Sequence, residues 1–165
     1  MTHETRPPET RMLPFSEVPK PEAPPRASPA EDRLAAEAVS FLTQFSLLDD
    51  RIRCRLRYQA HLKSLAFRGD LAASAVIRRL AETEDALDRD IDRLVDLKDL
   101  ILQLLGRLSR PEAARLLAEI YLNGRTVSQA AAQWGYSRRT AYRLRRKGLA
   151  ELGSLLTEGG RKSSA

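Results

Sequence analysis

Six of the eleven residues in the segment SRRTAYRLRRK, positions 137–147, are arginine or lysine, and none is acidic. Guanidinium and ammonium groups bind the phosphates of nucleic acids, and arginine can also donate two hydrogen bonds to O6 and N7 of guanine. Like charges one helical turn apart destabilise a helix, so folding alone does not account for this segment. We therefore expect its partner to be a polyanion outside the chain.

The positive excess of the chain is confined to its last third. The 165 residues carry a formal net charge of +6. Residues 111–165 hold ten Lys/Arg and four Asp/Glu, whereas residues 1–110 hold eighteen of each. A basic cluster in an otherwise neutral chain is typical of a DNA-binding module.

Other kinds of chemistry lack the residues that they need. Cys54 is the single cysteine, and the two histidines, His3 and His61, are far apart in the sequence. A thiolate metal site, a zinc site and a His-dependent triad are therefore not expected, and no phosphate-binding GxxxxGK[ST] loop occurs. We expect no enzyme and no cofactor. Without an apolar leader or an 18-residue apolar run, the sequence predicts a cytoplasmic protein.

The chain begins with a proline-rich segment. Eight of its nine prolines lie between Pro7 and Pro29, so residues 1–28 are expected to be a disordered tail. Ser28-Pro29-Ala30-Glu31 is a capping box with proline at the first helical position, which predicts the start of a helix.

Residues 29–108 are predicted to form a helical hairpin that turns at Gly69, with Asp70 capping the second helix. The strand-like alternation over 51–58 is not bounded by turn residues, and helical spacing continues on both sides. The first apolar stripe comprises Ala38, Phe41, Phe45, Leu48, Ile52, Leu56 and Leu62. The second, coiled-coil-like seam comprises Leu87, Ile91, Leu94, Leu97, Ile101, Leu104 and Leu108.

Complementary charges support this hairpin. Antiparallel folding about Gly69 places Arg51, Arg53, Arg55 and Arg57 opposite Glu82, Glu84, Asp85 and Asp88, and Asp49 and Asp50 opposite Arg89 and Arg93. Exposed pairs of this kind contribute only about 0.2–1 kcal/mol each, so they set register more than stability. The apolar end of the second helix, Leu97–Leu108, needs a further cover, which we expect the C-terminal unit to provide.

Residues 109–156 are predicted to form a three-helix DNA-binding domain, followed by a flexible tail at 157–165. Ser109-Arg110-Pro111-Glu112 opens its first helix, and the capping box Thr126-Val127-Ser128-Gln129 opens a short second one. Gly135 supplies a positive φ for the turn, and Ser137 caps a third helix running from Arg138 to about Leu156. Two helices across such a turn are typical of a helix-turn-helix, and Trp134 is expected in its core.

A helical wheel assigns roles within the third helix. Its inner stripe comprises Ala141, Leu144, Gly148, Leu152 and Leu155. The outward side chains are predicted to enter the major groove, with base reading by Arg138, Arg139, Tyr142 and Arg143 and phosphate contact by Arg145, Arg146 and Lys147. Thr140 is included in the same interface.

The stretch RLLAEIYLNGRTVSQAAAQWGYSRRTAYRLRRKGLAEL, residues 115–152, resembles region 4 of bacterial sigma factors. Together with EDALDRDIDRLVDLKDLILQLL it resembles the small RinA/ArpU-like late-transcription regulators of phages and prophages. The resemblance implies sequence-specific DNA binding and activation of phage genes, with Arg138, Arg139, Tyr142 and Arg143 at the base-reading positions. Arg139 replaces a common acid and Ala141 a larger aliphatic residue, so the target sequence does not carry over.

The sequence therefore predicts an all-α transcription regulator that binds double-stranded DNA, with RNA polymerase and a second copy of the chain, through the hairpin, as candidate partners. A phage terminase small subunit remains an alternative, and so does an adaptor whose basic helix binds an acidic protein surface. A complete sigma factor is less favoured, because residues 31–108 have only four aromatic residues and, with 13 Lys/Arg against 14 Asp/Glu, no net positive charge for promoter melting.

Overall fold

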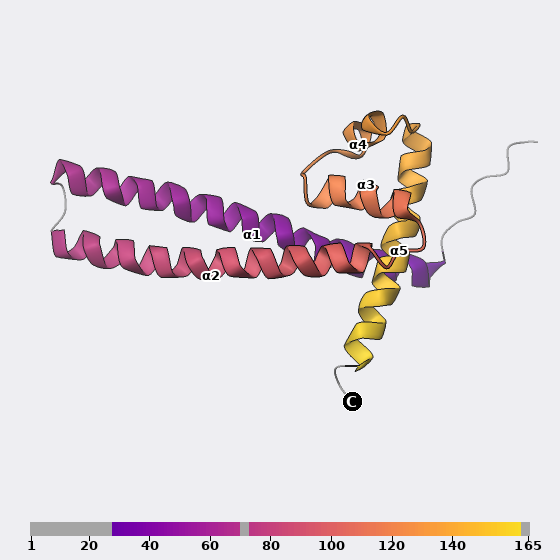
Figure 1. Ribbon diagram of the computed structural model, residues 1–165, viewed down its shortest axis with the longest axis horizontal. Coiled ribbons are helices and arrows are strands. Elements are labelled where there is room, and N and C mark those ends of the chain that lie inside the picture. The colour runs from indigo at the N-terminus through magenta and orange to yellow at the C-terminus, as the bar shows by residue number, and fades with distance from the viewer. Residues whose placement is uncertain (1–27, 70–72, 163–165) are drawn as a thin grey trace, which may run out of the picture.

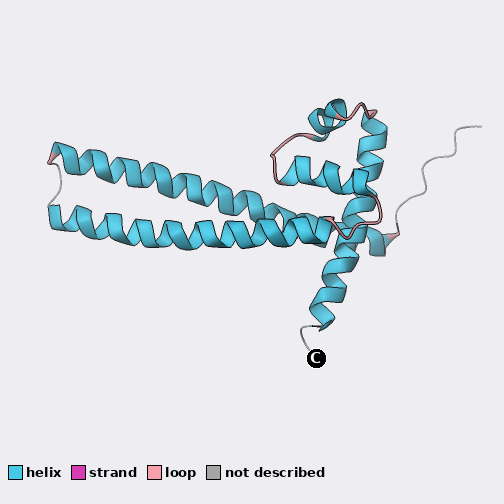
Figure 2. Cartoon of the chain, viewed as in Figure 1, coloured by secondary structure: helices cyan, strands magenta, loops and turns pink. Residues whose placement is uncertain are grey.

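The computed structural model describes residues 28–69 and 73–162. They form five helices and, within these ranges, no strand (Figures 1 and 2): α1 (Pro29–Arg68), α2 (Ala73–Leu105), α3 (Pro111–Tyr121), α4 (Val127–Gln133) and α5 (Arg138–Lys162). The all-α hairpin followed by a C-terminal three-helix unit is confirmed. The tail expected at residues 1–28, apart from Ser28, and the cap expected at Asp70 lie outside the described residues.

Local capping interactions define both ends of α1. At its start, the Glu31 N–H donates to Ser28 Oγ at 3.2 Å, and the Ser28 N–H donates to Glu31 Oε2 at 3.4 Å. At its end, Gly69 adopts φ 73°, which a β-branched residue rarely does. Between these caps the strand-like segment 51–58 is helical throughout, as expected.

The predicted seam of α2 is correct except near its middle. Leu87, Ile101 and Leu108 are buried, but Ile91 is 41% exposed and Asp90 occupies the inward position instead. The seam thus keeps its alternating three- and four-residue spacing with a carboxylate inside it. On α1, Ile52 and Leu62 are buried as expected, whereas Leu56 is exposed and the fully buried Leu42 was not anticipated.

The ionic pairing across the hairpin differs from the predicted blocks. Arg51 binds Asp90 through two hydrogen bonds of 2.8 and 2.6 Å, and Arg55 Nε donates to the same carboxylate at 2.9 Å. Arg53 pairs with Asp49 of its own helix. The predicted antiparallel arrangement is confirmed. The main ionic contact, however, joins Arg51 and Arg55 to the buried Asp90, which the sequence analysis did not identify.

The C-terminal unit packs on the open end of the hairpin, where α5 crosses α1 and the end of α2 (Figure 1). The shared core comprises Ala38, Leu42, Ile101, Leu105, Leu108, Leu117, Leu149 and Leu152. The end of α2 is therefore covered by this unit, as expected. The helix α5 continues to Lys162, beyond the expected end near Leu156, although residues 157–159 are exposed and its packing on the shared core ends at Leu156, so part of the expected flexible tail is helical. Within the described ranges, no helix is both long and apolar enough to cross a membrane.

Candidate nucleic-acid interface

A sharp turn joins α4 to α5. Thr126 caps α4 through a capping box with Gln129, as predicted. The chain then reverses at Gly135, which has φ 69°, and the Tyr136 N–H donates to the carbonyl of Ala131 at 2.9 Å. Ser137 Oγ accepts the N–H of Thr140 at 3.2 Å and so caps α5. The predicted helix-turn-helix geometry is present.

Small residues let α5 pack closely on the helices beneath it. Ala131 and Ala141 are buried where α4 and α5 meet, together with Leu144. A Cβ at Gly148 would lie 3.0 Å from Leu117 Cδ1 and 3.1 Å from the Ala113 Cβ, so α3 and α5 cross in near contact. This packing fixes which side of α5 faces solvent.

The solvent side of α5 carries most of the predicted DNA-binding residues. Arg138, Arg139, Arg143 and Lys147 are exposed, and Tyr142 is 55% exposed between them. Among the described residues, none of these four cations forms an ion pair with an acid. We call the set Arg138, Arg139, Arg143, Arg146 and Lys147 the basic face.

Three of the predicted residues are engaged within the protein. Thr140 is half-buried, and its Oγ1 accepts a hydrogen bond from Ser137 Oγ at 2.9 Å. Arg146 is exposed, but its Nη2 lies 3.8 Å from Asp32 Oδ1 of α1. Arg145 lies apart from the basic face: its Nη2 donates to the hydroxyl of Tyr121 at 2.7 Å, and its guanidinium lies 5.9 Å from the centre of that ring.

The expectation that Trp134 is a core residue is wrong. Its side chain is 39% exposed, and the guanidinium of Arg115 lies 5.5 Å from its ring centre. Trp134 is the C-cap of α4, and Tyr136 packs against the buried cluster in its place. Both side chains are exposed, so the pair joins α3 to the C-cap of α4 at the protein surface.

Two hydrogen bonds that the sequence did not indicate connect the α2–α3 linker to α5. Ser109 donates from its N–H to Glu151 Oε1 at 2.6 Å and from its Oγ to Glu151 Oε2 at 3.0 Å. The N-cap of α3 is Arg110, without a side-chain cap. No local sequence signal identifies the Ser109–Glu151 hydrogen bonds, because the two residues lie 42 positions apart.

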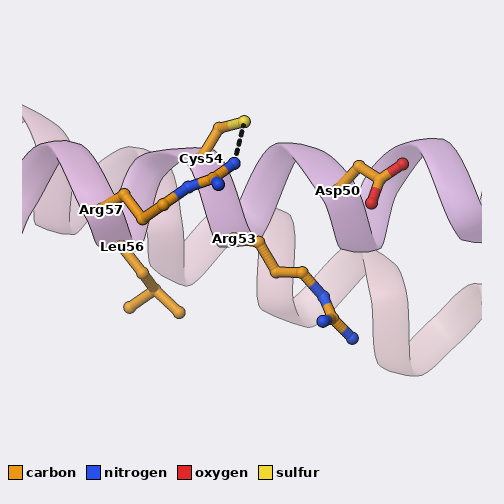
Figure 3. A pocket seen from close by; sticks show the side chains of 5 residues that line it. All are labelled: Asp50, Arg53, Cys54, Leu56 and Arg57. Carbon is orange, nitrogen blue, oxygen red and sulfur yellow. Dashed lines mark hydrogen bonds between the residues drawn. The ribbon is translucent and has the colours of Figure 1, made fainter.

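A surface depression lies on α1, outside the basic face. The depression drawn in Figure 3 is lined by Asp50, Arg53, Cys54, Leu56 and Arg57, all from α1. Among the lining side chains, Arg57 Nη2 donates a hydrogen bond to Cys54 Sγ at 3.2 Å. No group of His, Cys, Asp and Glu suited to a metal ion occurs in the part of the chain that the structure describes.

Residues 68–149 match the family model of ECF sigma factors. This part of the chain is similar to ECF sigma factors. The match includes α2, α3, α4 and the first half of α5, and therefore the whole basic face; α1 up to Phe67 lies outside it. It supports the sigma region 4-like helix-turn-helix and a DNA-binding, transcription-related function. No curated protein and no solved structure matches the chain.

Proposed function

We propose that the chain is a sequence-specific DNA-binding transcription regulator, without catalysis, that reads the major groove with α5. One observation carries the proposal. The similarity to ECF sigma factors covers a helix-turn-helix whose outward cations have no acidic partner among the described residues, except for the contact of Arg146 with Asp32. Phosphate binding and counterion release would offset the repulsion within this helix.

Within that function, the residues at the start of α5 read bases. Arg138, Arg139, Tyr142 and Arg143 lie in the first turns, which enter deepest in helix-turn-helix complexes. Arg146 and Lys147 lie farther along the helix and bind phosphates. Arg145 is removed from this set, because its guanidinium is held by Tyr121.

The hairpin offers a surface for a protein partner, which we propose to be RNA polymerase. On α2, Ile77, Ile91 and Leu102 are exposed, and each directly follows a buried residue of the seam, so all three lie about 100° from the seam in the same sense. On α1, the exposed Leu56 likewise follows an inward residue, the half-buried Arg55. Phe67 is also exposed and lies three turns farther along α1, so it points in the same direction as Leu56.

Antiparallel helices are related by a two-fold axis normal to their plane. Residues that follow an inward position therefore lie on the same face of the hairpin in both helices. With Val95, which follows Leu94, six exposed apolar side chains share this face: Leu56, Phe67, Ile77, Ile91, Val95 and Leu102. We propose that this row of exposed apolar residues is the contact surface for the partner.

A homodimer through the α2 seam is less well supported, because α1 and the C-terminal unit already bury Leu87, Ile101 and Leu108. A dimer would have to use the face of the hairpin that carries the six exposed apolar side chains instead. A phage or prophage origin, and the role of a late-gene activator, rest on the sequence resemblance to RinA/ArpU-like regulators.

Two alternatives share the same surface. A terminase small subunit would use the helix-turn-helix for DNA packaging, and an adaptor would use the basic face to bind an acidic protein. Selection from random duplexes separates the two DNA-binding functions from the adaptor, and the neighbouring genes separate a regulator from a terminase subunit. A regulator enriches one motif, and its affinity falls steeply with salt. Failure to bind any duplex at low salt would favour the adaptor.

A further inference from the structure

The first turns of α1 are held against the middle of α5. At Gly153 of α5, an added Cβ would overlap the carbonyl group of Leu34 of α1, so the two backbones are in direct contact. This contact, with the packing of Ala35 and Ala38 around it, fixes the start of α1 beside the DNA-binding helix (Figure 1).

One acid of α1 reaches the basic face from this position. Asp32, two residues before Leu34, places Oδ1 3.8 Å from Nη2 of Arg146. Both side chains remain open to solvent, with 67% of Asp32 and 49% of Arg146 exposed. Within the described residues, no other acid pairs with a cation of the basic face.

We propose that Asp32 lowers the affinity of the chain for DNA by competing with phosphate for Arg146. The inference rests on the proposed DNA-binding function. A phosphate that approaches Arg146 must displace the carboxylate, and the two anions then repel each other. Because the docking of α1 on α5 anchors its backbone, Asp32 stays near the phosphate path.

The effect of the Asp32–Arg146 contact on DNA affinity should not depend on the DNA sequence. Phosphate contacts carry no base information, so Asp32 should weaken binding by the same factor on every duplex. It would limit the time that the chain spends on non-target DNA without changing the ratio between target and non-target affinity.

The test measures binding of the full chain to a random-sequence duplex and to its selected site across a salt series. Asp32→Asn should tighten binding about two- to fivefold on both duplexes at low salt, a factor of the size expected for one exposed ion pair. It should steepen the plot of log K against log salt by about one unit, because Arg146 becomes free to release a counterion.

Three further variants decide whether Asp32 acts through Arg146. In an Arg146→Ala background, Asp32→Asn should give a clearly smaller gain than in the wild type, and Asp32→Glu, which keeps the charge, should bind as the wild type does. Glu37→Gln removes an acid of α1 that pairs with Arg33 instead, and should leave binding unchanged. Thermal unfolding of each variant shows that α1 stays folded.

The outcomes separate the two proposals. If the wild type binds duplex DNA but Asp32→Asn binds no tighter, the role of Asp32 is overturned and the DNA-binding function stands. An equal gain with and without Arg146 would also overturn it. If the wild type binds no duplex at any salt concentration, the proposed function itself fails, and this inference fails with it.

Discussion

Gly153 lies directly against the backbone of Leu34, where even a methyl group would overlap the Leu34 carbonyl. A helix backbone cannot shift locally as the end of a side chain can. The glycine therefore allows α5 to cross α1 in close backbone contact. The contact couples α5 to the hairpin, because the second half of α5 packs on the hairpin core.

Gly153→Ala should therefore destabilise the protein although alanine is the better helix former. We expect a loss of about 1–3 kcal/mol in the free energy of unfolding, the usual cost of overpacking. Gly159→Ala is the matched control, since nothing lies within 4 Å of a Cβ there. That change should stabilise by up to about 1 kcal/mol through helix propensity. Urea denaturation followed by circular dichroism gives both values, and equal effects at the two sites would contradict the close contact.

Asp90 should stabilise the hairpin through the charge it keeps. Burial alone would raise the pKa of Asp90, but the hydrogen bonds and positive charges of Arg51 and Arg55 outweigh burial and leave its pKa below the usual range. Asp90→Asn should cost about 1–3 kcal/mol at neutral pH, because the two arginines lose the negative charge and one of the two oxygens that accept their hydrogen bonds. Asp49→Asn, which removes the half-buried partner of the exposed Arg53, should cost less than about 1 kcal/mol.

The pH dependence of the same variant has a fixed sign. A carboxyl group with a depressed pKa in the folded state stabilises the fold above its unfolded pKa of about 3.9, and this stability is lost as the pH falls through the folded value. The gap in unfolding free energy between wild type and Asp90→Asn should be constant from pH 5 upward and shrink below about pH 4. A gap that stays constant into acid would show that Asp90 acts through packing alone.

The apolar face of the hairpin can be tested with two neighbouring leucines. Leu102 and Leu100 are 46% and 45% exposed and flank the buried Ile101, so they point to opposite faces. Leu102→Glu should weaken binding to core RNA polymerase at least tenfold, by charging the face that would be buried, while Leu100→Glu should bind like the wild type. Gel filtration and fluorescence anisotropy with labelled chain provide the measurement. Equal binding by both variants would remove this face from the proposal, and a loss of self-association in Leu102→Glu would identify a second copy as its occupant.

Local signals in the sequence predicted the helix boundaries well. Ser28 and Thr126 cap helices through side-chain hydrogen bonds three residues away, and Gly69 and Gly135 adopt positive φ where the chain turns. Each of these depends only on neighbouring residues. The basic face was also predictable, because an exposed face follows from helical periodicity once the buried stripe is known.

Contacts between distant segments were not predictable in the same way. Periodicity could not decide between Ile91 and Asp90 for the seam, and hydrophobicity favoured the wrong one, since the arginines that stabilise a buried Asp90 come from another helix. The contact of Arg145 was missed for the same reason, because its partner also lies on another helix. Its place in a basic run suggested DNA, whereas Tyr121, on α3, provides its partner.

Arg145 and Lys147 should therefore respond differently to the same substitution. Arg145→Ala removes the hydrogen bond and the ring contact with Tyr121, so it should lower the free energy of unfolding by about 1–2 kcal/mol. Tyr121→Phe, which keeps the ring but lacks the hydroxyl, should reproduce part of that loss. Lys147→Ala should leave stability within about 0.5 kcal/mol, because the residue is exposed and pairs with no acid among the residues that the structure describes.

The salt dependence of DNA binding then gives the opposite ranking. Lys147→Ala should reduce the slope of log K against log salt by about one unit, as expected for one lost phosphate contact, while Arg145→Ala should leave the slope unchanged. Filter binding at four or more salt concentrations measures both slopes on one duplex. If Arg145→Ala lowers the slope and leaves unfolding unaffected, its guanidinium turns from Tyr121 to DNA in the complex, and Arg145 returns to the phosphate-binding set.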